Sequence, residues 1–145
     1  MIFRIFVLIT LFSMGVKAQI LVSPLFQQGK ELSLNEGSLK NKLVMFFKSE
    51  CSACRAQAKD LSCLNEEQVI YLGFSSLVSE LQKEARLMGL SKNVYYAPKE
   101  VVRSFGLKKD YSPVLFAFNG QGKSKSWLGK QNCKVFVRYL AGDSK

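Results

Sequence analysis

An apolar run that ends just before two closely spaced cysteines constrains the fold of this chain more than any other feature. The run LVMFF, Leu43 to Phe47, is continuous enough for a β-strand that is covered on both faces. Cys51 and Cys54 follow in a C-x-x-C arrangement, and residues 51–64 contain helix formers and no Gly or Pro. The sequence therefore predicts a buried strand followed by a helix that begins at or just before Cys51, with Ser49 as its N-cap.

Strand-like and helix-like segments alternate along the rest of the chain. Further strands are expected at the edge segment 30–42, at 68–74, at 93–97, and in a β-hairpin of 113–118 and 123–129 around the turn 119–122. Further helices are expected at 75–90, 98–106 and 133–142. This alternation predicts right-handed crossovers and a mainly parallel sheet to which the hairpin adds an antiparallel edge. The expected fold class is therefore an α/β three-layer sandwich, in which helices flank a mixed sheet.

The predicted helix at 75–90 has its own start signal and its own apolar face. Ser75 or Ser76 is the expected N-cap, and Gly89 stands at the end of the helix. One face is expected to turn inward, and it consists of Val78, Leu81, Ala85 and Met88.

The predicted position of the C-x-x-C motif favours redox chemistry. Free backbone N–H groups and the helix dipole stabilise a thiolate in the first turn of a helix. We therefore expect Cys51, at the exposed start of the helix, to be the nucleophile. Cys54, one turn inside and shielded, would be the resolving thiol. Arg55 adds a nearby positive charge that favours the thiolate, whereas Glu50 opposes it.

Two other interpretations of the motif remain open at this point. A structural zinc site usually has two ligand pairs at short spacing, but the other two cysteines are 70 residues apart and the chain has no His. No metal site is therefore expected. An inert structural disulfide is the other alternative, and it would make the protein a redox-inactive binding or scaffold domain.

The first 18 residues have the pattern of a secretory signal peptide. They contain an early Arg4, an apolar core and the small-residue ending Val16-Lys17-Ala18. Cleavage after Ala18 would leave residues 19–145 as one domain in a periplasmic or other exported location. All four cysteines lie in this part, and an even count suits an oxidising compartment.

The charge of the chain narrows the range of partners. The first 18 residues carry two basic and no acidic side chains, so their removal lowers the formal net charge from +10 to +8. Such a charge allows association with an anionic membrane surface. The basic residues are scattered and no basic run is interleaved with aromatics, so no nucleic-acid partner is expected. No nucleotide-binding loop or small-molecule cofactor site is indicated.

Cys63 and Cys133 lie outside the C-x-x-C motif. Cys63 lies far along the helix that begins near Cys51, and Cys133 starts the last predicted helix. If both helices pack on one face of the sheet, a structural disulfide could join them. The alternative is two buried free thiols that act as small apolar groups.

These features together resemble the thioredoxin superfamily, and within it the periplasmic TlpA/ResA-like branch, over about residues 30–142. The similar segments are LSLNEGSLKNKLVMFFKSECSACR at 32–55, an insertion at 75–97 followed by EVVRSFGL, YSPVLFAFNGQGK at 111–123, and WLGK at 127–130. The resemblance implies a thioredoxin-like fold with a cis Pro113 against the Cys51–Cys54 pair. It also implies a substrate groove in which the backbone of Ser112 pairs with a bound chain.

The implied activity is thiol–disulfide exchange with cysteines of other exported proteins, together with a redox partner that recycles the dithiol. The chain departs from the family at the buried acid, because Met45 and Gln57 occupy the two positions where relatives carry one. Gln57 cannot accept a proton near neutral pH, so slower resolution by Cys54, or resolution that relies on water, is predicted. Glu50 and Asp60 are expected to be surface charges.

Overall fold

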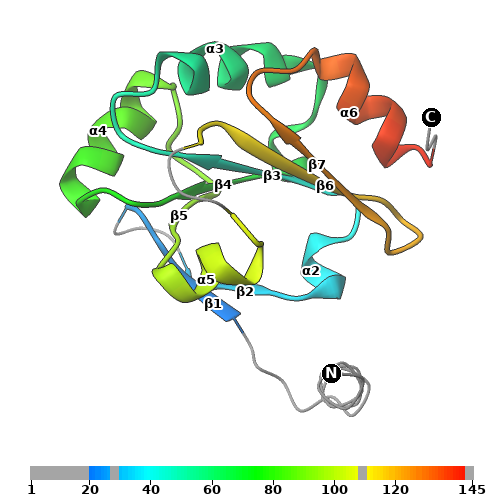
Figure 1. The fold of residues 1–145 in the computed structure, drawn as a ribbon, viewed down its shortest axis with the longest axis horizontal. Coiled ribbons are helices and arrows are strands. Elements are labelled where there is room, and N and C mark those ends of the chain that lie inside the picture. Colours follow the sequence, from blue (N-terminus) through cyan, green and yellow to red (C-terminus); the bar gives the residue numbers. More distant parts are fainter. Residues whose placement is uncertain (1–19, 27–29, 108–110, 143–145) are drawn as a thin grey trace.

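A computed structural model describes residues 20–26, 30–107 and 111–142 of the chain (Figure 1). The expected signal peptide, residues 1–18, lies outside the described residues. Within the described part of the chain, no helix has the length and apolar character needed to cross a membrane.

Within the residues that the structure describes, seven strands form one sheet in the order β2-β1-β5-β4-β3-β6-β7. Their bounds are β1 Ile20–Pro24, β2 Leu32–Leu34, β3 Lys42–Phe47, β4 Val69–Gly73, β5 Val94–Tyr96, β6 Val114–Phe118 and β7 Ser124–Leu128. The expected strand at Leu43–Phe47 is therefore β3, which pairs with β4 on one side and β6 on the other. The predicted hairpin is also present, as β6 and β7.

The sheet is mixed, as expected, but the alternation of strands and helices overestimated the share of parallel pairings. Among the described strands, only β3–β4 and β4–β5 pair in parallel, whereas β1–β2, β1–β5, β3–β6 and β6–β7 are antiparallel. The chain enters β6 from Ser112, which lies beside Cys51 at the end where β3 finishes, so β6 must run opposite to β3. Strand β1, which the sequence did not signal, adds a further antiparallel pairing at the other side of the sheet.

Helices cover both faces of the sheet, so the expected α/β three-layer sandwich is confirmed (Figure 1). The helices are α2 Glu36–Leu39, α3 Ser52–Asp60, α4 Val78–Leu87, α5 Lys99–Ser104 and α6 Cys133–Leu140, with 3-10 turns η1 Leu61–Cys63 and η2 Glu66–Gln68. Figure 1 shows α3, α4 and α6 above the sheet and α2 and α5 below it.

Alternation along β3 explains the continuous apolar run in the sequence. Leu43, Met45 and Phe47 belong to the hydrophobic core beneath α3, α4 and α6. Val44 and Phe46 belong to the second core, on the side of α2 and α5. Because successive side chains of a strand point to opposite faces, a strand with a helical layer on each side needs apolar residues at every position.

Both predicted serine N-caps were wrong. Helix α3 begins at Ser52 with Cys51 as its N-cap, and α4 begins at Val78 with Leu77 as its N-cap. Glu50 and Ser75 adopt left-handed φ values of 55° and 59°, so the backbone turns sharply before each helix. The Ser49 and Ser76 hydroxyls instead bond to each other at 2.9 Å, and the Ser49 amide donates to the Ser76 hydroxyl at 3.3 Å.

The inward face of α4 differs from the predicted one. Leu81 and Ala85 are fully buried as expected, but Val78 is 45% exposed. A charged residue, Glu84, is buried on this face instead. The physical reason for its burial lies at the start of α3.

Candidate redox site

Cys51 and Cys54 form a disulfide at the start of α3, where Cys51 is the N-cap and Cys54 lies in the first turn, with their Cα atoms 5.2 Å apart. The motif follows the carboxyl end of β3, and α3 begins at Ser52, directly after Cys51. Cys54 is fully buried and Cys51 is only 7% exposed. The expectation of an exposed Cys51 was therefore wrong in extent, because the loop before β6 packs against its sulfur.

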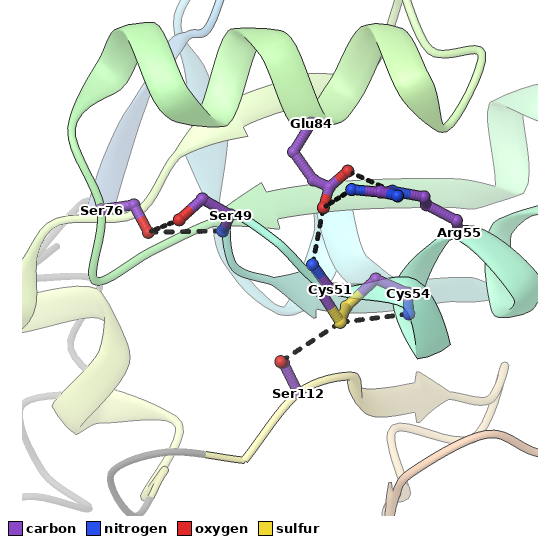
Figure 2. Close-up of a disulfide and its surroundings, with 7 residues drawn as sticks. All are labelled: Ser49, Cys51, Cys54, Arg55, Ser76, Glu84 and Ser112. Carbon is purple, nitrogen blue, oxygen red and sulfur yellow. Dashed lines mark hydrogen bonds and ion pairs between the residues drawn. A yellow bond between two sulfur atoms is a disulfide. The ribbon is translucent and has the colours of Figure 1, made fainter.

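Two donors point at the Cys51 sulfur (Figure 2). The Cys54 amide donates to Cys51 Sγ at 3.1 Å, and the Ser112 hydroxyl donates to the same atom at 3.3 Å. The Ser112–Pro113 peptide bond is cis, the form that the family resemblance implies. In the reduced protein the same two donors would face a Cys51 thiolate, and donors at a helix start stabilise that charge.

A buried carboxylate that the sequence analysis missed lies against the motif. Glu84 of α4 is 1% exposed, and its Oε1 accepts a hydrogen bond of 2.7 Å from the Cys51 amide. Arg55 donates from Nε to Oε2 at 2.7 Å and from Nη2 to Oε1 at 3.1 Å. The hydrogen bond with Glu84 raises the pKa of Arg55, against the opposing effect of desolvation. The bonds to Arg55 and to the backbone of Cys51 compensate the burial of Glu84.

A sequence signal for Glu84 did exist. Glu84 lies three residues after Leu81 and next to Ala85, so it falls on the same helical stripe as these two apolar residues. An acid on an inward stripe needs a cationic partner, and Arg55 directly follows the C-x-x-C motif. The two residues are 29 positions apart in the chain, and only the packing of α4 beside α3 brings them together.

Gln57 ties α3 to the segment that leads into α6. Its side chain is fully buried, its Nε2 donates to the Gln131 carbonyl at 3.1 Å, and its Oε1 accepts from the Gln131 amide at 2.6 Å. An amide can satisfy a backbone donor and a backbone acceptor at once, which an ionised carboxylate cannot. At this position the chain therefore has a pair of structural hydrogen bonds rather than a proton acceptor.

We expect Gln57→Glu to make stability depend on pH. The ionised carboxylate of this variant would face the Gln131 carbonyl in a buried site, so its pKa in the folded state would rise above the unfolded value of about 4.3. The folded state then holds more protons than the unfolded one, so stability falls as pH rises above that value. Urea unfolding should show a loss of roughly 1–3 kcal/mol at pH 7 and a smaller loss near pH 4. An equal loss at both pH values, or one matched by Gln121→Glu on the exposed hairpin turn, would contradict this.

The second pair of cysteines lies at the other end of α3. Cys63 of η1 is bonded to Cys133, the first residue of α6, with Cα atoms 6.2 Å apart. Asp60 and Lys130 form an exposed ion pair of 2.9 Å in the same region, and Glu50 is also exposed. In the described ranges, no three His, Cys, Asp or Glu side chains gather in a way that could hold a metal ion.

The fold is that of thioredoxin-like thiol–disulfide interchange proteins. A thioredoxin-family thiol:disulfide interchange protein from Chlorobium tepidum aligns with a TM-score of 0.64 at 18% identity, over 85% of this chain and 91% of that one. A secreted disulfide oxidoreductase of Mycobacterium tuberculosis gives 0.60 at 18% identity, over 85% and 96%. An exposed lipoprotein thioredoxin of Streptococcus pneumoniae gives 0.60 at 20% identity, over 86% and 98%. No family model and no curated protein matches the sequence.

We expect Ser112→Ala to weaken thiolate formation at Cys51 in the reduced protein. The Ser112 hydroxyl donates directly to Cys51 Sγ, and a hydrogen bond to a charged group contributes on the order of 1.5 kcal/mol, or about tenfold in the thiolate fraction. The pH dependence of Cys51 alkylation should move to higher pH by about one unit. Ser112→Thr, which keeps the hydroxyl, should stay close to the native profile. An unchanged profile in Ser112→Ala would show that this hydroxyl does not stabilise the thiolate.

Proposed function

We propose that this protein is an exported thiol–disulfide oxidoreductase that exchanges disulfides with cysteines of other exported proteins. One observation carries the proposal: a Cys51–Cys54 disulfide at the start of α3, with the Cys54 amide and the Ser112 hydroxyl both donating to Cys51 Sγ. This arrangement stabilises the form of Cys51 that attacks disulfides, while the fully buried Cys54 is kept for the second step.

In the reducing direction the exchange has two steps. The Cys51 thiolate attacks one sulfur of a substrate disulfide, forms a mixed disulfide and releases one substrate thiolate, which takes up a proton. The Cys54 thiol then loses its proton and attacks the Cys51 sulfur, which restores the Cys51–Cys54 disulfide and releases the second substrate thiolate. Two electrons pass to the substrate, and a redox partner must return two electrons to the pair. The same steps in reverse oxidise a substrate dithiol.

The segment at Ser112 and Pro113 is the proposed substrate groove. Ser112 contacts the sulfur that would carry the mixed disulfide, and the preceding Tyr111 is 54% exposed. A substrate chain that lies along this segment would bring its own cysteine to Cys51. The bound chain would form main-chain hydrogen bonds with the backbone of Ser112. Such bonds do not depend on the side chains of the substrate, which suits a protein that acts on several partners.

Two further observations support an exported location. The first 18 residues have the pattern of a signal peptide, and two of the similar structures are those of a secreted disulfide oxidoreductase and an exposed lipoprotein thioredoxin. The expected partners are cysteine-containing exported proteins. The net charge of +8 after cleavage would also favour contact with anionic membrane surfaces.

Equilibration with glutathione and catalysis of disulfide reduction together test the proposal. The purified protein should exchange its Cys51–Cys54 disulfide with reduced and oxidised glutathione, as measured by alkylation and mass spectrometry. It should also accelerate the reduction of insulin disulfides by a small thiol. A pair that stays oxidised at every glutathione ratio, with no acceleration, would instead support an inert thioredoxin-like scaffold domain.

A further inference from the structure

The buried carboxylate of Glu84 bonds both to the backbone of Cys51 and to the guanidinium of Arg55. Its oxygens accept from the Cys51 amide, from Arg55 Nε and from Arg55 Nη2, as Figure 2 shows. Oε1 is shared between the Cys51 amide and the Arg55 guanidinium, so the cation and the first cysteine lie on either side of one oxygen atom. The ion pair therefore lies directly beside the reactive disulfide.

The charge of Arg55 is the important quantity in this arrangement. A cation beside a cysteine lowers the pKa of its thiol, and a dithiol whose reduced form is stabilised in this way becomes a stronger oxidant. Arg55 directly follows Cys54 and its side chain is 41% exposed, yet its guanidinium binds both oxygens of Glu84. The positive charge is thus largely balanced by a carboxylate before it can act on the Cys51 sulfur.

We propose that Glu84 is a positioning residue that biases the Cys51–Cys54 pair toward the disulfide by holding Arg55 and neutralising its charge. This inference rests on the proposed thiol–disulfide exchange. With Glu84 in place, the Cys51 sulfur has only the Cys54 amide and the Ser112 hydroxyl as the donors seen in the described part of the chain. The reduced pair is therefore less stabilised than its helix-start position and its neighbouring arginine alone would predict, which favours a protein that reduces its substrates.

Glu84→Gln is the direct test. Glutamine keeps the length of the side chain and an oxygen for the Cys51 amide, but it removes the charge that balances Arg55. In glutathione mixtures, two glutathione molecules supply two electrons and two protons to the disulfide and leave as oxidised glutathione. We expect the equilibrium constant of this reaction to shift about tenfold toward the protein dithiol, which corresponds to about 30 mV.

Three further variants separate this electrostatic role from simple damage to the structure. Glu84→Gln/Arg55→Gln removes both charges and should return the equilibrium to within about twofold of the native value, because the unbalanced Arg55 causes the shift. Arg55→Gln alone should shift the equilibrium toward the disulfide or leave it unchanged. Asp60→Asn removes an acid from an exposed ion pair with Lys130 at the far end of α3, and it should have no effect.

The outcomes distinguish this inference from the proposed function itself. A native protein that does not equilibrate with glutathione would overturn the proposed function. If the native protein equilibrates, the inference is overturned by a Glu84→Gln shift no larger than that of Asp60→Asn, or by a shift toward the disulfide. It is equally overturned if the double variant keeps the shifted equilibrium. A shift of the Arg55→Gln equilibrium toward the dithiol would also overturn it, and this variant can be measured even if Glu84→Gln does not fold. Peptide mass spectrometry should quantify the Cys63–Cys133 disulfide separately, so that only the Cys51–Cys54 pair enters the equilibrium constant.

Discussion

Replacing Cys51 with alanine is expected to abolish disulfide exchange, with the rate falling to that of the uncatalysed reaction. Cys51 is the cysteine of the pair with residual exposure, and both donors at the disulfide point to its sulfur. Cys54 is fully buried and cannot replace it as the attacking group. Insulin reduction by a small thiol, followed by turbidity, would measure the loss.

Cys54→Ser gives the matched test of the second step. This variant keeps the Cys51 nucleophile but has no resolving thiol, so mixed disulfides with substrates should accumulate and be visible on non-reducing gels. Cys51→Ala/Cys54→Ser should trap nothing. Full activity in Cys51→Ala, or an absence of trapped species in Cys54→Ser while the native protein is active, would contradict the assigned roles of the two cysteines.

Loss of the Cys63–Cys133 bond should cause the largest change in stability. The bond joins residues 70 positions apart, and in the chain-entropy model a loop of this length stabilises the folded state by roughly 4 kcal/mol. Cys63→Ser/Cys133→Ser should therefore unfold at a much lower urea concentration than the native protein. Exchange activity at low temperature should be retained, because this bond lies at the opposite end of α3 from Cys51.

A single variant separates the cross-link from the packing of its sulfur atoms. Cys63 is exposed whereas Cys133 is buried, so Cys63→Ser breaks the bond while Cys133 still fills its place in the core. Cys63→Ser should lose most of the stability that the double variant loses. If Cys63→Ser unfolded at the same urea concentration as the native protein, the loop-closure explanation would be wrong.

The central strand and the helix after it could be predicted because their signals are local. The apolar run at Leu43–Phe47 requires cover on both faces, and the segment after Cys51 has few alternatives to a helix. Strand directions were harder to predict, because they depend on where the chain crosses the sheet. The segment before β6 returns to the end of β3 at Ser112, and nothing in the residues of β6 themselves shows that it runs antiparallel.

The site followed the same division between local and distant signals. The C-x-x-C motif was proposed as a site from its own residues, and the segment at Ser112 was proposed from the family resemblance. The side-chain contact of Ser112 with Cys51 was not predicted. Glu84 was missed because its role depends on a contact with Arg55 across two helices. Ser49 was predicted as one helix cap and Ser75 or Ser76 as another, yet the hydroxyls of Ser49 and Ser76 bond to each other across two loops. Local cap rules cannot foresee such a pairing between distant residues.

The attachments of α3 have a consequence for how the disulfide can open. The helix is held at its start through Glu84, in its middle through Gln57 and just beyond its end through Cys63. The first link reaches α4, and the other two reach the start of α6. We expect these links to keep α3 in place when the Cys51–Cys54 bond breaks, because none of the three depends on that bond. Reduction should then require mainly that the Cys51 and Cys54 side chains separate, with little backbone rearrangement between the two oxidation states.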